Sequence, residues 1–487
     1  MASRLLTKTK YLNGLQCHRL LWMAFNQPES LPAIDIVSQH IFGQGNEVDK
    51  LAKKLYPTGV NIAAVSFVDT INKTRAQLDK GRPIFQAGFK AGDSYSRVDI
   101  LLPGGNGGWE LVEVKSSTQV KPEHYPDVAF QRYCCEKAGL SISKCSVATV
   151  NNKYVRKGDV DPQEFFVIED VTEQADSVAV GMEDAIAAMF KVIALPECPQ
   201  LNLSPKCRDP RDCPLIEDCQ LSLPDHHVLT LYYGKQAGYA LLSQGVQCIK
   251  DIPDGFKLTA IQRIQRECVL TDEPHIDGEA LQVFLGNLRY PIAYFDFETI
   301  NPAIPLYDGM RPYQKIPFQF SLVVVPNEDA EPQCFSFLAK SADDPRHALL
   351  AEMKRQIPDI GSIVVYNKGF EGPILKQLGE SFLGYREWLD GLAPRLYDLW
   401  EPFKKFHFYH PEQQGSTSIK HLLPTLTGRS YEGMEIADGE TASVLYWNVT
   451  HEPAAEVERQ KVYSDLEKYC GLDTDGMRSI VERLQCL

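Results

Sequence analysis

Two carboxylates stand inside an apolar stretch of the C-terminal half, YFDFET at residues 294–299. Asp296 and Glu298 are two residues apart, so both side chains lie on one face of an expected strand, opposite the flanking phenylalanines. Strands contain few acidic residues, and burying an unpaired carboxylate is costly. Hard divalent cations such as Mg²⁺ bind oxygen ligands of this kind. The spacing therefore predicts a divalent metal site on this strand.

Two later segments add polar side chains that could reach the same site. The stretch SIVVYNKGFE predicts a buried strand, a turn and a helix whose first turn carries Glu371. In DLEKYCGLDTDGMRSIVERLQ, residues 465–485, Asp473 interrupts an apolar helical stripe and Tyr469 lies one turn before it. Both side chains are therefore expected to face the interior. Asp398 is either a further ligand or a cap at the end of a strand, and we favour the cap.

A second acidic constellation surrounds a glycine turn in the N-terminal half. SRVDILLPGGNGGWELVEVKSS, residues 96–117, predicts two strands joined at GGNGG. A hairpin folded about Asn106 places Asp99 opposite Glu113, with Lys115 on the same face as Glu113. Like charges in a direct cross-strand pair are destabilising. Either a salt-bridged surface or a metal site accounts for the pattern, and the apolar surroundings favour the metal site.

Four of the thirteen cysteines have a suggestive arrangement. Cys207, Cys213 and Cys219 follow C-x5-C-x5-C spacing in a proline-rich loop, and Cys17 lies near the N-terminus. The number of cysteines is odd and high for a reducing compartment, so metal ligation, or burial as small hydrophobic side chains, is a better interpretation than a disulfide framework. Cys198 is an alternative fourth ligand because it is local, and zinc suits four thiolates as well as iron does.

The composition and the periodicity of the chain indicate its organisation. At about 150 residues per domain, 487 residues correspond to two to four domains. Residues 1–225 alternate helical and strand patterns, residues 226–288 are mostly helical, and residues 289–487 show a second α/β pattern. We expect a mixed α/β (α+β) protein with two α/β domains and a helical connector. Within the connector, LLSQGVQCIKDIPDGFKLTAIQ is either a plain helical segment or resembles a helix-hairpin-helix module that binds DNA backbone.

The charge and the hydropathy of the chain narrow the class of protein. A net charge of −14 argues against a broadly basic surface, so any nucleic-acid groove must be local. No apolar run reaches the ~18 residues that a membrane span needs. The N-terminus has no signal-peptide pattern, and we expect a cytoplasmic protein without a membrane partner.

The C-terminal motifs occur in a specific order: D-x-E on a strand, N-x-x-F-E after a strand, and Y-x-x-x-D on a late helix. This order resembles the DnaQ-like (DEDD) 3′–5′ exonucleases of the tyrosine subclass and covers about residues 290–487. The motif residues are Asp296, Glu298, Asn367, Phe370, Glu371, Tyr469 and Asp473. The resemblance implies a ribonuclease H-like fold in which the four acidic residues hold two Mg²⁺ or Mn²⁺ ions and the tyrosine orients water. Glu371 stands where the family usually has Asp, and Lys420 is interpreted as local structure.

The N-terminal constellation D-x13-E-V-K resembles the PD-(D/E)XK nucleases of the RecB-like branch, which have a restriction-endonuclease-like fold. The resemblance implies that Asp99, Glu113 and the carbonyl group of Val114 bind one or two metal ions. Lys115 would then position the attacking water.

Two flanking helices add residues by the same resemblance. The helix with PDVAFQRYCC resembles the one that carries the family's glutamine, here Gln131, with Tyr133 as a lesser candidate. The helix with FGQGNEVDK resembles the one that carries a metal-binding histidine. Asp49 occupies that place, Glu47 is its rival, and the nearby His40 is interpreted as structural.

The cysteine pattern resembles the iron–sulfur members of the RecB-like branch. In those proteins, four thiolates on both sides of the nuclease core hold a [4Fe–4S] cluster. By this resemblance the ligands are Cys17, Cys207, Cys213 and Cys219.

Together the motifs resemble a bacterial family that joins a RecB-like nuclease domain to a DnaQ-like exonuclease domain. The predicted function is metal-dependent hydrolysis of DNA, single-stranded or with free ends. The alternatives are an RNA exonuclease and a nucleic-acid-binding scaffold in which one or both sites are inactive.

Overall fold

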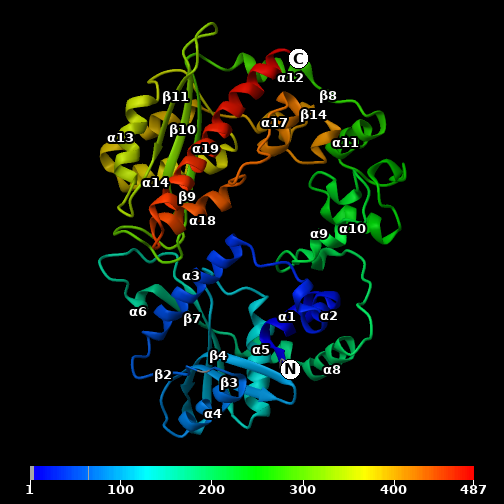
Figure 1. The fold of residues 1–487 in the computed structure, drawn as a ribbon, viewed down its shortest axis with the longest axis vertical. Coiled ribbons are helices and arrows are strands. Elements are labelled where there is room, and N and C mark those ends of the chain that lie inside the picture. Colours follow the sequence, from blue (N-terminus) through cyan, green and yellow to red (C-terminus); the bar gives the residue numbers. More distant parts are fainter. Residues whose placement is uncertain (1–4, 64) are drawn as a thin grey trace. The chain divides into compact units, whose positions relative to one another are not determined.

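The computed structural model describes residues 5–63 and 65–487 and is a mixed α/β protein, as the sequence predicts. Its chain divides into two compact units, which are considered separately (Figure 1). Unit 1 consists of Met1–Ser222 and Pro302–Gln314, and unit 2 consists of Leu223–Asn301 and Lys315–Leu487.

Unit 1 is built on a seven-stranded sheet of order β2-β3-β4-β5-β6-β7, with β1 paired to β4. Its strands are β1 Leu6–Thr7, β2 Val60–Asn61, β3 Ile84–Ala91, β4 Ser94–Pro103, β5 Trp109–Val114, β6 Ile142–Val150 and β7 Phe166–Asp170. The β4–β5 hairpin pairs Ile100 with Val112 and Leu101 with Leu111, which is the register expected for a turn centred on residue 106. Asp99 directly precedes Ile100 on β4, and Glu113 directly follows Val112 on β5, so the two acids lie on neighbouring strands beside this pair.

Helices cover both faces of this sheet. The helices of unit 1 are α1 Lys8–Gln16, α2 His18–Asn26, α3 Ile36–Lys53, α4 Phe67–Leu78, α5 His124–Lys137, α6 Pro162–Phe165, α7 Thr172–Ala179, α8 Met182–Ile193 and α9 Ile216–Gln220. One core joins α1, α2, α5, α7 and α8 to the sheet through side chains such as Tyr11, Leu21 and Phe130. A second core joins α3 to the opposite face through Val48 and Leu51.

The segment 302–314 belongs to unit 1 although it connects two strands of unit 2. Ala303 is buried in the core beneath α3, and its amide donates to Gln44 at 2.7 Å. Arg156 donates to the carbonyl groups of Pro305 and Leu306 at 2.7 Å each. These contacts tie the segment to the unit that contains the β4–β5 hairpin.

Unit 2 contains a five-stranded sheet of order β11-β10-β9-β12-β13. The strands are β9 Ile292–Ile300, β10 Ile316–Val325, β11 Gln333–Leu338, β12 Ser362–Val365 and β13 Leu396–Asp398. The central strand β9 runs antiparallel to β10 and parallel to β12. Its position in the middle of the sheet explains why YFDFET is so apolar.

The two faces of β9 meet different helices (Figure 1). Phe295 and Phe297 pack into a core with α13 Arg346–Gln356, α14 Lys368–Ser381 and α15 Arg386–Leu392. The other face meets α18 Gly439–Thr450 and α19 Glu456–Gln485, beside α17 Ile419–Thr427. On α19 the expected stripe is buried, namely Leu466, Tyr469, Asp473, Met477, Ile480 and Leu484.

The rest of unit 2 is mostly helical. Its elements are α10 Lys235–Ser243, α11 Ala260–Thr271, β8 His275–Ile276, α12 Gly278–Gly286, α16 Glu401–Lys404 and β14 Phe408–Tyr409. β8 pairs with β14. Where a helix-hairpin-helix would have its second helix, the chain forms a short 3₁₀ turn, Ile249–Asp251.

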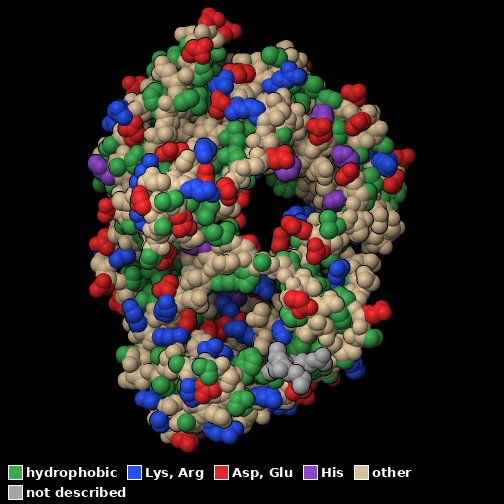
Figure 2. Space-filling model, in the orientation of Figure 1, with side chains coloured by type: hydrophobic (Ala, Val, Ile, Leu, Met, Phe, Trp, Pro, Cys, Tyr) green, Lys and Arg blue, Asp and Glu red, His purple; other side chains and the backbone are tan. Residues whose placement is uncertain are grey.

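Charged side chains of both signs are interspersed over the face of the molecule in Figure 2. Within the described part of the chain, no helix combines the length and the apolar character that a membrane span requires.

Candidate metal centres and cysteine cluster

The C-terminal site begins with a close pair of carboxylates on β9. Ligand atoms of Asp296, Glu298 and Cys470 all lie within 4.8 Å of one another. Among the described residues, this is the one group of three or more His, Cys, Asp or Glu side chains with that geometry. Cys470, on α19, donates to Asp296 Oδ2 at 3.7 Å. The central strand and the last helix thus bring two distant motifs together.

Asp473 joins this site through α19 and is surrounded by tyrosines. Tyr431 donates a short hydrogen bond to Asp473 Oδ1, and Tyr469 also bonds to this carboxylate. The rings of Tyr431 and Tyr469 are 6.1 Å apart. The tyrosine expected from the sequence therefore lies at the site, and a second tyrosine lies there as well.

Glu371 lies in the first turn of α14 and is only 1% exposed. Its Oε2 atom is buried, and the described residues offer it no hydrogen-bond partner. Burial, followed by repulsion from Asp296, raises the pKa of this carboxyl group to about 9. Asp398 instead accepts from the backbone amides of Asn367 and Trp400 at 3.0 Å each, as expected of a cap.

The electrostatics of the C-terminal site show an excess of buried acid. Burial and the neighbouring Asp473 raise the pKa of Asp296 well above its ordinary value, and burial and Asp296 do the same for Glu298. Burial also raises the pKa of Asp473 to about 6. In the described part of the chain, no lysine or arginine lies within 4.0 Å of these carboxylates or of Glu371. A bound cation would relieve this repulsion.

Lys420 is the one basic side chain whose charge acts on most of these carboxyl groups. It lowers the pKa of Asp296, Glu298 and Asp473, although burial outweighs this effect. Its Nζ lies 5.4 Å from the centre of the Tyr469 ring and donates to the carbonyl group of Ala437. The interpretation of Lys420 as local structure therefore understates its place beside the site.

The N-terminal site gathers around the end of β5. Lys115 Nζ lies 2.6 Å from Glu113 Oε1 and 2.5 Å from Asp127 Oδ2. Gln131, on α5, donates to Glu113 Oε2 at 2.7 Å and to Asp127 Oδ1 at 2.8 Å. Asp99 accepts from the Val114 amide at 3.0 Å. The structure therefore brings the expected residues of this hairpin and helix together.

Asp49 reaches this site through a glutamine. Gln86 Nε2 lies 3.2 Å from Asp99 Oδ1 and 3.5 Å from Asp49 Oδ1. Asp49 also pairs with Lys53 at 2.6 Å. Its rival Glu47 forms an exposed pair with Lys50, so Asp49 is the better placed of the two.

The two lesser candidates make other contacts. His40 hydrogen-bonds to Gln44 at 2.8 Å. Tyr133 packs against the core of unit 1, with Lys137 Nζ 5.7 Å from the centre of its ring.

The two carboxylates of the hairpin have opposite electrostatic environments. Burial and repulsion from Glu113 raise the pKa of Asp99 to about 7. Burial disfavours the charge of Glu113 as well, but Lys115 and Lys8 hold its pKa well below the usual range. Two lysines therefore compensate the charge of Glu113. Asp99 forms no ion pair among the described residues, although Lys8 lowers its pKa somewhat.

Sequence reasoning missed several residues of both sites: Lys8, Gln86 and Asp127 in unit 1, and Tyr431 and Cys470 in unit 2. Asp127 had a signal, because it precedes Gln131 by four residues on an expected helix and so shares its face. Cys470 follows Tyr469 directly, and its contact with Asp296 depends on how α19 is rotated. Lys8 and Tyr431 are distant in sequence from the acids that they contact.

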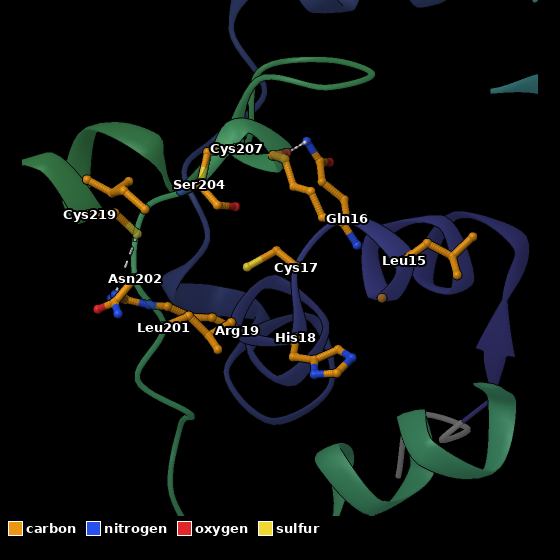
Figure 3. A pocket seen from close by; sticks show the side chains of 13 residues that line it. Leu15, Gln16, Cys17, His18, Arg19, Leu201, Asn202, Ser204, Cys207 and Cys219 are labelled. Carbon is orange, nitrogen blue, oxygen red and sulfur yellow. Dashed lines mark hydrogen bonds between the residues drawn. The ribbon is translucent and has the colours of Figure 1, made fainter. Parts of the chain in front are cut away.

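The four expected cysteines gather between α1, α2 and the proline-rich loop. Cys17 joins α1 to α2, and its side chain hydrogen-bonds to Cys213, which lowers the pKa of Cys17 to about 6. Figure 3 shows Cys17, Cys207 and Cys219 on the walls of one pocket. Arg19 donates to Cys219 Sγ at 3.6 Å.

All thirteen cysteines are free thiols. Cys198 packs in the same hydrophobic cluster as the other four, but it does not line the pocket that Cys17 lines. Burial raises the pKa of Cys198, and the charges of Arg19 and Cys17 also act on it. Cys213 does not line this pocket either, and its hydrogen bond to Cys17 connects it to the group.

Comparisons with known proteins find similarity over part of the chain. Residues 293–418 match the family described as "Domain of unknown function (DUF2779)", a span that includes all of β9 but its first residue, includes Glu371, and ends before α19. The chain is 28% identical over 222 residues to the uncharacterized protein MG366 of Mycoplasma genitalium and 27% identical over 223 residues to its homolog in Mycoplasma pneumoniae. Each alignment covers 42% of this chain and 33% of the relative.

The uncharacterized protein UU173 of Ureaplasma parvum is 25% identical over 220 residues, which are 40% of this chain and 31% of that protein. This chain thus matches about a third of the length of the relatives to which it is similar.

Proposed function

We propose that this chain is a metal-dependent nuclease with one hydrolytic site in each unit. The observation that carries the proposal is the convergence of four acids from three separate elements: Asp296, Glu298, Glu371 and Asp473. Three of them are buried, Asp296 is half-buried, and among the described residues none of the four has an ion-pairing cation. Buried carboxylates of this number are stable together when divalent cations neutralise them.

The C-terminal residues fit a metal site of the DnaQ-like kind. The orphaned Oε2 atom of Glu371 and the close Asp296–Glu298 pair supply hard oxygen ligands for Mg²⁺ or Mn²⁺. Such ions would activate water and stabilise the leaving oxygen of a phosphodiester. Tyr469, which hydrogen-bonds to Asp473, would orient the water, and Tyr431 would keep Asp473 in position through its own hydrogen bond.

The N-terminal residues fit a second site of the RecB-like kind. Asp99, Glu113 and the carbonyl group of Val114 would hold the metal ion, with Asp49 reaching the site through Gln86. Lys115 positions the attacking water, and Gln131 orients Glu113 by donating to its Oε2 atom. The proposed substrate is DNA with an unpaired end, which rests on analogy with enzymes of these classes.

The cysteine cluster supports a further part of the proposal, a structural [4Fe–4S] cluster. Four thiolates can hold such a cluster without lying as close together as the ligands of a single ion, because they bind different iron atoms. An absorption spectrum with iron and zinc analysis of anaerobically purified protein tests this. About four irons per chain support the cluster, and stoichiometric zinc without iron refutes it.

Cleavage assays with Mn²⁺ test the nuclease function. Labelled single-stranded DNA and RNA of matched sequence are incubated with wild type, Asp99→Asn and Asp296→Asn. We expect Asp296→Asn to abolish trimming from the 3′ end and Asp99→Asn to abolish the other cleavage. The exposed acids Asp93 and Asp329 serve as matched controls, because their Asn variants should cut normally. Intact substrate in every wild-type reaction would establish the scaffold alternative, and cleavage of RNA alone would establish the RNA exonuclease.

A further inference from the structure

The side chain of Lys8 contacts the acidic pair of the N-terminal site. Its Nζ lies 2.8 Å from Glu113 Oε1 and 3.3 Å from Asp127 Oδ1. Lys115 contacts the same two carboxylates at 2.6 and 2.5 Å. Two ammonium groups therefore share two carboxylates whose side chains are 1% and 3% exposed.

The sheet fixes where the chain enters α1, so this contact is part of the fold. β1 pairs with the start of β4, at Ser94 and Tyr95, and β5 pairs with the later part of β4, from Ile100 onward. Asp99 lies between these two pairings. Lys8 directly follows β1, so it lies close to Asp99 and Glu113, where β5 stops pairing with β4.

Lysine is an unfavourable residue for the helix at this position. Lys8 is the first residue of α1, where the positive end of the helix dipole repels a cation. The contacts with Glu113 and Asp127 offset this repulsion. The positive charge of Lys8 therefore serves its contacts with Glu113 and Asp127 and not the stability of helix α1.

Both carboxylate oxygens of Glu113 already accept hydrogen bonds. Oε1 accepts from Lys8 and Lys115, and Oε2 accepts from Gln131. A metal ion between Asp99 and Glu113 must compete with these donors. Lys8 makes longer contacts than Lys115, and it lines a pocket of about 240 Å³ that Asp99 also lines and Lys115 does not. Of the two lysines, Lys8 is therefore the one whose side chain can move into an adjoining pocket.

We propose that Lys8 is a displaceable counter-ion of the N-terminal metal site. It neutralises Glu113 and Asp127 while no divalent cation is bound, and it leaves Glu113 for the adjoining pocket when one binds. This inference rests on the proposed metal site at Asp99 and Glu113. With both lysines in place, two positive charges face the three carboxylates, whereas a divalent cation together with Lys115 balances all three. Lys8 is a positioning residue that keeps the acids in place and lowers their affinity for metal.

Manganese binding tests the proposal without any cleavage. Free Mn²⁺ is followed by electron paramagnetic resonance in full-length protein whose C-terminal site carries Asp296→Asn and Asp473→Asn. In this background we expect Lys8→Met to bind Mn²⁺ about tenfold more tightly, which corresponds to ~1.4 kcal/mol. Lys8→Arg keeps the charge and should resemble wild type. Lys10→Met is the matched control on the same helix, because Lys10 Nζ lies over the Phe25 ring and forms no ion pair with an acid among the described residues.

The inference is overturned if Lys8→Met binds Mn²⁺ with unchanged or weaker affinity. Should that variant fail to fold, Lys8→Gln retains a hydrogen-bond donor without the charge and must also bind more tightly. Asp99→Asn separates this inference from the proposed function. If Asp99→Asn abolishes Mn²⁺ binding but Lys8→Met leaves the affinity unchanged, the metal site stands and only the role of Lys8 is refuted. No Mn²⁺ binding by either wild type or Lys8→Met in this background refutes both.

Discussion

Glu371→Gln is the substitution that best tests the excess of buried acid in the C-terminal site. The Glu371 carboxyl group is buried, and its Oε2 atom has no partner among the described residues. Its pKa rises from the ordinary 4.5 to about 9, first because of burial and then because of Asp296. Between these two values the folded protein keeps a proton that the unfolded chain releases. The free energy of unfolding of the metal-free protein therefore falls as the pH rises through this window.

The size of the effect follows from the pKa shift. At pH 7 the solution is about 2.5 pH units above the ordinary pKa, and each unit corresponds to ~1.4 kcal/mol. At pH 7, therefore, the Glu371 carboxyl group lowers the free energy of unfolding by at most about 3 kcal/mol. Gln has nearly the same shape and does not titrate. We expect metal-free Glu371→Gln to exceed wild type in stability by about 1–3 kcal/mol at pH 7, by at least as much at pH 8, and by less than ~1 kcal/mol at pH 5.

Calorimetric unfolding in the presence of a chelator measures this difference at pH 5 and pH 8. Glu380→Gln is the matched control, because Glu380 lies on the same helix α14 and is exposed. Its stability should stay within about 0.5 kcal/mol of wild type. The reasoning is refuted if Glu371→Gln gives no gain at pH 8, or a larger gain at pH 5 than at pH 8. With Mn²⁺ present the order should reverse, because the variant lacks a ligand.

Three further predictions concern other parts of the chain. Cys17→Ser should lose most of the bound iron in anaerobic preparations, whereas Cys198→Ser should keep it; the opposite result identifies Cys198 as the fourth ligand. Tyr431→Phe removes the hydrogen bond to Asp473 and should slow Mn²⁺-dependent trimming about tenfold, the effect of losing ~1.4 kcal/mol; an unchanged rate contradicts a positioning role. Gly361→Ala should lower the stability of unit 2 by more than about 2 kcal/mol in calorimetry. Gly361 has φ +88°, and an added Cβ would lie 2.0 Å from a backbone oxygen, so a variant as stable as wild type disproves this packing.

Local patterns were enough to predict much of the fold. The alternation in YFDFET predicts a strand with two carboxylates on one face, and β9 has them there. The glycine-rich turn sets the register of the β4–β5 hairpin, because a hairpin pairs residues at equal distances from its centre. The stripe from Leu466 to Leu484 predicts the buried face of α19. These features depend on interactions between neighbours in sequence.

Other contacts had no local signal. Lys8 reaches Glu113 across 105 positions of the chain, and Tyr431 reaches Asp473 across 42. The sequence around Lys8, TKTKYLNGL, gives no sign that this lysine contacts an acid. Only the pairing of β1 beside β5 on the same strand delivers this lysine to the acids.

The amino-acid sequence by itself determined the strands, the helices and the acidic residues that face inward, because period and turn chemistry are local properties. The tertiary structure alone decided which of those acids acquire a cation from the protein. Glu113 is neutralised by two lysines, whereas Asp296, Glu298 and Glu371 have no ion-pair partner within the described residues. The physical reason is that charge compensation acts through space, between side chains whose distance depends on how the whole chain packs.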